Sequence, residues 1–144
     1  MSFKFCSLFS GSSGNASYIA TEKTHILVDA GLACRSIEKA MKEIGLDPSM
    51  LDGILITHEH DDHIRGAGVV SRKYNVPIYA NEATWQAMEG KIGNISSNNI
   101  RIFDNNMDFY IKDINIQPFD IPHDAASPVG FCFFKKGKKI SPET

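Results

Sequence analysis

Apolar and polar residues follow two different periods along this chain, and each change of period marks an expected element. Alternation or short apolar runs, the signal of strands, occur at residues 3–9, 18–20, 25–28, 54–56, 78–80, 100–103, 108–111, 114–119 and 129–134. Helical patterns occur at residues 35–44, 64–74 and 82–88. Strands and helices alternate in the first half, and strands dominate the second. The pattern therefore predicts an α/β chain, α+β by sheet type, with a mixed sheet and flanking helices.

Turn-forming residues separate these elements. Residues 10–15 have the sequence Ser-Gly-Ser-Ser-Gly-Asn, and the polar segment 21–24 joins two strands as a hairpin. Gly45 ends the first helix, and Asn81 is placed to cap the N-terminus of the third. Residues 90–99 are rich in Gly, Asn and Ser, so we expect a loop there.

Composition narrows the class of protein. The chain has 144 residues, 42% of them hydrophobic, and a net charge of -2. This length suits one domain with a core of its own. A charge so near zero excludes a polyanion binder that relies on bulk positive charge. No run approaches the roughly 18–20 apolar residues of a membrane helix, and the N-terminus alternates like a strand rather than a signal peptide, so we expect no membrane partner.

The cysteines indicate the compartment. Cys6, Cys34 and Cys132 are odd in number, far apart in sequence and without a C-x-x-C pair. This pattern predicts three reduced, mostly buried thiols in a cytoplasmic protein.

Candidate chemistry is concentrated in one segment, His-Glu-His-Asp-Asp-His at residues 58–63. Imidazole and carboxylate groups are ligands for metals such as zinc. His58 and His60 are two residues apart, so in extended chain their side chains leave on one face. A turn then returns Asp62 and His63 from the start of the next helix. These four residues are predicted to surround a pocket at the end of a buried strand.

A plainer interpretation is that Asp61 or Asp62 only caps the helix that begins near His63. Four residues of ligand type crowded after an apolar strand favour the metal site, because ionisable groups seldom cluster without charge compensation.

At these residues the sequence resembles the metallo-β-lactamase fold superfamily, whose signature is H-x-H-x-D-H. Residues 26–31, Ile-Leu-Val-Asp-Ala-Gly, resemble the strand of that family that ends in Asp-x-Gly, and residues 122–124, Pro-His-Asp, resemble its later metal-binding histidine. Residues 10–15 and 123–131 resemble the YycJ (WalJ) branch, whose bacterial members are regarded as metallohydrolases and DNA exonucleases.

The resemblance implies roles for individual residues. His58, His60 and His123 would bind a first divalent metal ion, zinc or manganese, and Asp62 and His63 would bind a second. Asp62 would also be catalytic, because it orients the metal-activated water. Asp29 would hold the ligand loop without binding metal; the alternative is a turn residue at the end of a strand.

The serine-rich segment before the second strand is a candidate substrate loop. Its small residues expose backbone N–H groups that can approach a phosphate closely, although no Gly-Lys-Ser/Thr follows as in a P-loop. The alternative is a plain turn. The residues concerned are Ser10, Ser12, Ser13 and Asn15.

The resemblance ends near the C-terminus of the sequence. In the family, a strand after the lysine-rich segment 135–139 ends in an Asp that bridges both metals, and a last His follows; here Pro142 interrupts that strand and no histidine follows His123. We therefore expect residues 1–144 to form a single partial domain, the N-terminal half of an αββα sandwich with its second half absent. Such a chain would expose apolar surface and associate, and would hold one metal ion well.

Three functions follow as hypotheses. The first is a metal-dependent hydrolase of phosphodiesters with nucleic acid as substrate, resembling a DNA exonuclease. The second is a thioester or lactam hydrolase of the same fold. The third is a non-catalytic metal-binding remnant, for which the absent Asp and His argue.

Overall fold

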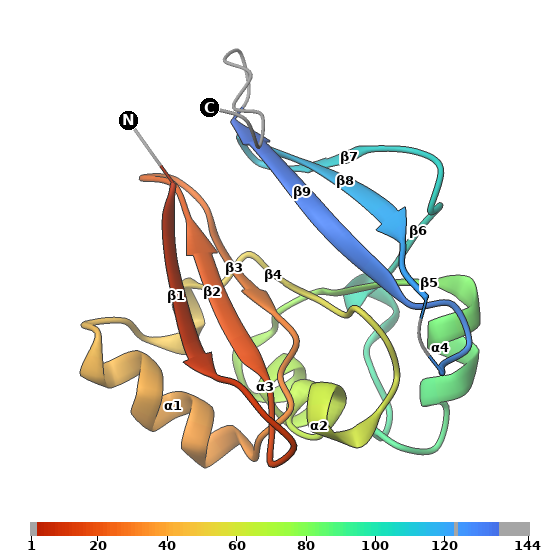
Figure 1. Ribbon diagram of the computed structural model, residues 1–144. Coiled ribbons are helices and arrows are strands. Elements are labelled where there is room, and N and C mark those ends of the chain that lie inside the picture. Colours follow the sequence, from red (N-terminus) through yellow and green to blue (C-terminus); the bar gives the residue numbers. More distant parts are fainter. Residues whose placement is uncertain (1–2, 123, 136–144) are drawn as a thin grey trace.

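Nine strands form two sheets in the part of the chain that the computed structural model describes, residues 3–122 and 124–135 (Figure 1). The strands are β1 (Lys4–Phe9), β2 (Ala16–Ala20), β3 (His25–Val28), β4 (Gly53–Leu55), β5 (Ile78–Asn81), β6 (Ile100–Phe103), β7 (Phe109–Ile111), β8 (Ile114–Asp120) and β9 (Val129–Lys135). The helices are α1 (Cys34–Glu43), α2 (Asp61–Ile64), α3 (Ala67–Tyr74) and α4 (Glu82–Met88), with short 3₁₀ turns η1 (Pro48–Met50) and η2 (Ser97–Asn99).

The larger sheet is mixed and follows the order of the chain. Strands β1 to β6 lie side by side in sequence order. The first three pair antiparallel through short loops, whereas β3 to β6 pair in parallel. Parallel neighbours need a crossover, and α1, α3 and α4 lie in these connections. The smaller sheet, β7-β8-β9, is antiparallel.

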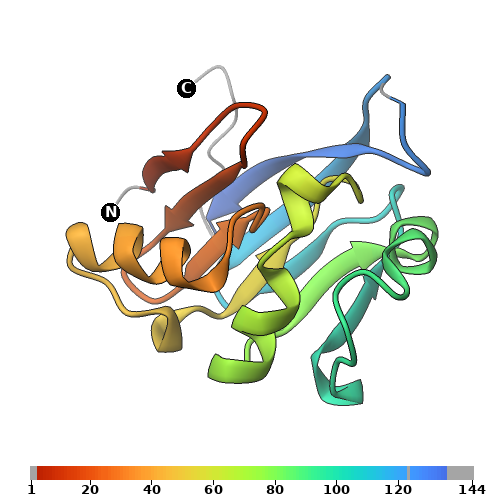
Figure 2. The same cartoon turned by 90° about the horizontal axis from the view of Figure 1, so that it is seen from below.

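Two apolar cores separate three layers of structure. In β3, Leu27 belongs to the core shared with the helices, and its neighbour Ile26 belongs to the core between the sheets. Ile54 and Leu55 of β4 divide in the same way. Strands that bury both faces are apolar throughout, which is why these segments show runs rather than alternation. The helices thus cover one face of the six-stranded sheet and β7-β8-β9 covers the other (Figures 1 and 2).

The layered fold confirms the expected α/β class, and the helix predicted over residues 64–74 is confirmed over residues 67–74, where α3 lies, but not as one continuous helix. Two helices occupy this region, because α2 ends at Ile64 and residues 65–66 interrupt the helical hydrogen bonding before α3 begins at Ala67. Gly66 lies at the break, where a Cβ would be 1.9 Å from the carbonyl oxygen of Leu32. This close backbone approach is a tertiary contact that the apolar period does not encode.

The cysteines also differ from expectation in one respect. Cys6, Cys34 and Cys132 are free, as expected, but all three are half-buried rather than mostly buried.

Among the described residues, no helix has both the length and the apolar character to cross a bilayer.

Asp113 lies in the turn between β7 and β8 and connects the smaller sheet to the β2–β3 turn of the larger sheet. Its carboxylate accepts a hydrogen bond from the Thr21 hydroxyl at 2.9 Å and another from the Thr24 hydroxyl. Partial burial would raise the pKa of Asp113, but the hydrogen bonds from Thr24 and Thr21 outweigh it and lower the pKa below its ordinary value. The ionised form of Asp113 therefore stabilises the fold.

Asp113→Asn should reduce the free energy of unfolding at pH 7 by about 1 kcal/mol, because Asp113 is partly exposed and its hydrogen bonds lie at the low end for a charged acceptor. A depressed folded-state pKa gives stability that is complete above about pH 4, the unfolded value, and that disappears as the pH falls through the folded value. Urea unfolding at pH 7 and pH 3 should show a smaller difference between wild type and variant at pH 3. An equal difference at both pH values would contradict this role.

Candidate metal centre

The candidate metal-binding residues lie where two parallel strands end. Val28 of β3 pairs with Leu55 of β4, so the carboxyl ends of the two strands share one edge of the sheet. Asp29 follows β3 directly. The segment after β4, residues 57–63, is called the histidine loop below; its last three residues form the first turn of α2.

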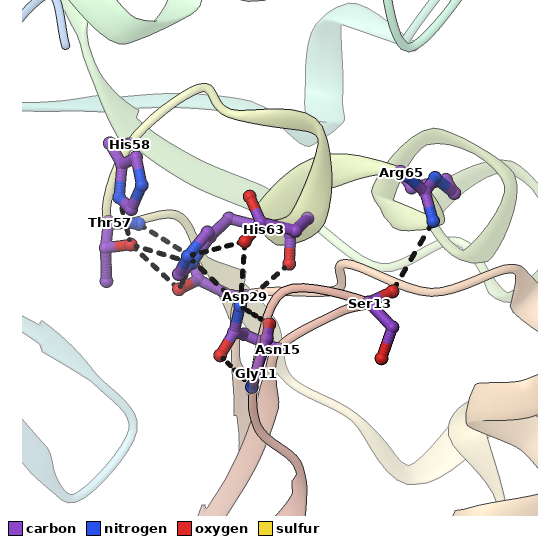
Figure 3. Close-up of polar contacts among 9 residues, drawn as sticks. Gly11, Ser13, Asn15, Asp29, Thr57, His58, His63 and Arg65 are labelled. Atoms are coloured by element: carbon purple, nitrogen blue, oxygen red, sulfur yellow. Dashed lines mark hydrogen bonds and ion pairs between the residues drawn. The ribbon is translucent and has the colours of Figure 1, made fainter. Parts of the chain in front are cut away.

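Asp29 binds the histidine loop through both carboxylate oxygens (Figure 3). Oδ1 accepts from the Thr57 backbone N–H at 2.8 Å, and Oδ2 accepts from the Thr57 hydroxyl at 2.8 Å. Oδ2 also lies 2.6 Å from Nδ1 of His63. The side chain is buried and its backbone is left-handed, with φ of 64°. Asp29 therefore occupies a turn conformation and holds the loop at the same time, so the two interpretations of this residue are compatible.

The Asp29–His63 pair shifts the pKa of both groups. Burial raises the pKa of Asp29, although the hydrogen bonds from His63 and Thr57 oppose the shift. Burial alone would lower the pKa of His63, but the hydrogen bond to Asp29 and the charges of Asp29 and Asp62 together raise it. The carboxylates beside His63 thus favour positive charge on the ring, and a metal ion bound at His63 would have to displace the proton from the ligand nitrogen.

The three histidines of the loop lie together. The ring centroids of His58 and His60 are 4.7 Å apart, and those of His58 and His63 are 4.0 Å apart. Oδ2 of Asp62 is 3.8 Å from Nε2 of His63. His58 is buried, and its Nδ1 is 2.9 Å from the Thr57 hydroxyl.

This donor set fits a divalent metal by its chemistry. Imidazole nitrogens and a carboxylate suit zinc and related ions, and because Nδ1 of His63 contacts Asp29, Nε2 is the nitrogen that could bind a metal. Within residues 3–122 and 124–135, however, no three His, Cys, Asp or Glu side chains are arranged to hold a metal ion as they stand. His123, the remaining predicted ligand of the first metal, lies outside the described residues.

The predicted substrate loop lies against the histidine loop. The Asn15 backbone N–H donates to the Asp62 carbonyl at 2.8 Å. Its side-chain Nδ2 is 3.3 Å from Oδ2 of Asp62 and 3.2 Å from Nε2 of His63. Asn15 is therefore directed toward the candidate ligands rather than toward solvent, whereas Ser10, Ser12 and Ser13 are exposed. The guanidinium of Arg65 is 3.5 Å from the Ser13 carbonyl oxygen (Figure 3).

Gly31 permits this close packing. A Cβ at Gly31 would lie 1.8 Å from the Asp62 carbonyl oxygen and 2.8 Å from the Asn15 nitrogen. Backbone hydrogen bonds run from Gly31 N–H to the Asn15 carbonyl, 2.9 Å, and from Ala30 N–H to the His63 carbonyl, 2.9 Å. Three segments far apart in sequence are thus joined backbone to backbone.

Another segment, between β8 and β9, lies beside the histidine loop in its described residues, 121–122 and 124–128. The Val129 N–H donates to the Thr57 carbonyl at 2.9 Å, and the Ala126 N–H donates to Oε2 of Glu59 at 3.0 Å. This segment includes position 123.

Sequence reasoning missed several residues that build this region. It gave no role to Thr57 or Glu59 and assigned Asn15 to the substrate. Thr57 could have been found, because it lies two residues after the end of β4, at the same edge of the sheet as Asp29. Nothing local marks Glu59 as a partner of Ala126, which is 67 positions away.

A helix–sheet–sheet arrangement with a histidine-rich loop at the carboxyl edge of the sheet defines a metallohydrolase fold. The chain matches the family described as the metallo-beta-lactamase superfamily over residues 10–139. It belongs to this superfamily, as the resemblance of its motifs implied.

Two curated relatives are similar over nearly the whole chain. Exodeoxyribonuclease WalJ of Streptococcus pneumoniae serotype 2 (strain D39 / NCTC 7466) is 46% identical over 140 residues, which are 96% of this chain and 52% of that protein. Exodeoxyribonuclease YycJ of Bacillus anthracis is 43% identical over 141 residues, 98% of this chain and 53% of that protein. The chain spans about half the length of these relatives.

The solved structures agree on the fold. The Rm3 metallo-beta-lactamase superposes with a TM-score of 0.76 over 92% of this chain and 54% of that chain, at 15% sequence identity. An identity this low supports a shared architecture, which is the expected layering of a mixed sheet and flanking helices.

Proposed function

We propose that this chain carries the metal-binding region of a metal-dependent phosphodiesterase that acts on DNA in the cytoplasm, with the activity of an exonuclease. The observation that carries the proposal is the histidine loop, which contains four residues of ligand type and is held by contacts of Thr57 and His63 with the buried carboxylate of Asp29. The similarity to two exodeoxyribonucleases supports DNA as the substrate. Three free cysteines support a reducing compartment.

The proposed metal ligands divide into two groups. His58, His60 and His123 would hold a first divalent ion, zinc or manganese, and Asp62 and His63 would contribute to a second. We expect about one tightly bound ion per chain, because three imidazoles make the fuller ligand set. That residues 1–144 act as one partial domain is part of the same proposal.

Each residue has a distinct task in this proposal. A bound divalent metal would supply a hydroxide nucleophile by lowering the pKa of water to about 7. Asp29 fixes the ring of His63 through Nδ1, so Nε2 faces the site. The half-buried carboxylate of Asp62 would orient the attacking water and accept its proton.

The serine-rich segment is the proposed contact for the DNA backbone. Ser12 and Ser13 are exposed on a loop whose last residue, Asn15, contacts Asp62. A phosphate that contacts their N–H and hydroxyl groups would therefore lie close to the proposed site of attack.

Asp62→Ala should lower hydrolysis of linear duplex DNA by about 100-fold or more, since even residues that only orient a ligand cost 10–100-fold. Asp61→Ala is the matched control, because Asp61 is the adjacent acid on the same turn but is exposed. We expect it to change the rate less than about threefold, as for a surface substitution. The measurement is release of labelled nucleotides with added zinc or manganese, beside metal content by elemental analysis.

Equal losses in the two variants would show that the motif has been assigned in the wrong register. Wild-type protein that binds metal but releases no nucleotide from DNA would contradict the nuclease activity while leaving the metal site in place.

A further inference from the structure

Strand β6 is an edge of the six-stranded sheet, because β5 is its only paired neighbour among the described residues. Tyr79 of β5 faces β4, since its carbonyl accepts from the Ile56 N–H at 2.9 Å. Its partner in β6 is Arg101, whose main-chain groups therefore pair with β5. Successive residues of a strand direct their main-chain groups to opposite edges, so those of Ile102 face outward. Within the described part of the chain they make no hydrogen bond, and this edge is open to a further strand.

A groove of about 630 Å³ lies beside this edge and is called the β6 groove below. Trp85 and Met88 line it on the side of α4, and Ile100 and Ile102 line it on the side of β6. Ile100 is 38% exposed and Ile102 is 62% exposed. An occupant that covered these side chains would remove apolar surface from water, which favours binding.

The wall of the β6 groove formed by residues 89–95 is a loop that is fixed in place. The Arg72 guanidinium donates to the carbonyls of Ile92 at 2.8 Å and Asn94 at 2.9 Å. Gly68 of α3 lies so close that a Cβ there would be 2.0 Å from the Ile92 carbonyl oxygen. The groove is therefore formed before anything binds, and an occupant does not have to order its wall.

Charge around the β6 groove indicates what would occupy it. Its described lining includes two exposed acidic side chains, Glu82 and Glu89, and no basic one. On the opposite face of β6, Asp104 and Asp108 line a second hollow together with Arg101. Nucleic acid is a polyanion and would be repelled by these carboxylates. A second copy paired symmetrically through β6 would bring the same acidic surface against itself. The complementary occupant is a chain segment with basic and apolar side chains.

We propose that the β6 groove docks an extended segment of a partner protein, in which lysine or arginine alternates with apolar residues. The segment pairs with the open edge of β6 as an added strand, through the main chain of Ile102. Alternate side chains of a strand leave on opposite faces, so its apolar side chains enter the groove against Trp85. The carboxylates on both faces of β6 attract its basic side chains. None of the described residues that line the groove belongs to the histidine loop, so this site is separate from the candidate metal centre.

Fluorescence measures occupancy directly, because Trp85 is the only tryptophan of the chain and lines the groove. The probe is the peptide Lys-Val-Lys-Val-Lys-Val-Lys, and the matched control is Glu-Val-Glu-Val-Glu-Val-Glu. We expect a saturable change in Trp85 emission with the lysine peptide and at least about tenfold weaker binding of the glutamate peptide. Added salt should weaken binding of the lysine peptide, since it screens exposed charges.

Glu82→Lys combined with Glu89→Lys should weaken binding of the lysine peptide about tenfold, because each exposed ion pair contributes a factor of about 1.4–5 and both are reversed. The control reverses two exposed acids elsewhere, Glu22→Lys with Glu43→Lys, and changes the net charge equally. We expect it to change the affinity less than about threefold. Urea unfolding of both double variants should match wild type, as for other surface substitutions.

Methylation of alternate peptide amides tests the added strand. Only every second residue of a strand directs its N–H toward a given neighbour, so one set of methyl groups removes the hydrogen bonds to β6 and the other set leaves them in place. One methylated lysine peptide should bind at least about tenfold more weakly than the parent, and the other should bind within about threefold of it.

The contrary outcomes are equally specific. No saturable change in Trp85 emission up to about 1 mM lysine peptide would overturn the proposal. Equal affinity for the lysine and glutamate peptides would overturn it too, as would two methylated peptides that bind alike. A dimer in sedimentation whose formation alters Trp85 emission would show that a second copy occupies the groove instead. Metal and DNA take no part in these measurements, so their result is independent of the proposed function.

Discussion

Asp29→Asn is expected to weaken metal binding by about 10–100-fold while leaving most of the fold's stability in place. Asparagine tolerates the left-handed backbone of this position, where φ is 64°. Its Oδ1 can still accept from the Thr57 N–H. The Nδ2 that replaces Oδ2 is a donor, so Nδ1 of His63 must become the acceptor and its proton moves to Nε2. That proton occupies the nitrogen proposed to bind metal.

Asp29→Ala should behave differently. It removes the acceptor for two hydrogen bonds from Thr57 and one contact to His63 in a buried place, and it leaves alanine with a positive φ. We expect a loss of about 3–4 kcal/mol in the free energy of unfolding, against about 1–2 kcal/mol for Asp29→Asn. Urea unfolding and metal titration of both variants test this. Wild-type metal affinity in Asp29→Asn would show that Asp29 does not set the tautomer of His63.

Gly31→Ala should destabilise the chain by about 3 kcal/mol or more, and should displace the histidine loop. The added methyl group would lie 1.8 Å from the Asp62 carbonyl oxygen, so backbone rather than a flexible side chain must move. Overpacking in a well-packed region usually costs about 1–3 kcal/mol, and a forced backbone shift lies at or above the top of that range.

Gly45→Ala is the matched control for Gly31→Ala. Gly45 has a φ of 81°, and nothing lies within 4 Å of the position that a methyl group would take, so its replacement brings strain without collision. We expect a loss of about 1 kcal/mol and unchanged metal affinity. Comparable losses in the two variants, measured by urea unfolding, would mean that the contact at Gly31 does not hold the histidine loop in place.

Local pattern was sufficient to predict most of the elements. Strands such as β3 and β4 were recognisable because both of their faces are buried. Asn81 was recognisable as a cap because asparagine is a preferred N-cap residue, and its side chain does accept from the Thr84 N–H. The break before α3 was missed, since it depends on contact between Gly66 and the Leu32 carbonyl from another segment.

The same distinction between local sequence pattern and tertiary contact applies to the residues of the candidate site. The histidine loop could be found because its ligand types lie within six consecutive residues. The inward direction of Asn15 and the contact of Glu59 with Ala126 could not, because each depends on a partner at least 47 residues away. The sequence thus identifies the candidate ligands, and tertiary contacts decide how their side chains are oriented.

The short span of the histidine loop has a consequence for calorimetry. Because three imidazoles and a carboxylate remain within six residues of one another, the unfolded chain keeps a local metal-binding segment. A ligand that binds both states stabilises the native state only by the ratio of its two affinities. Added zinc should therefore raise the melting temperature by less than its native-state dissociation constant implies. The size of that increase measures how much more tightly zinc binds to the folded site, which Asp29 and Asn15 orient, than to the same segment in the unfolded chain.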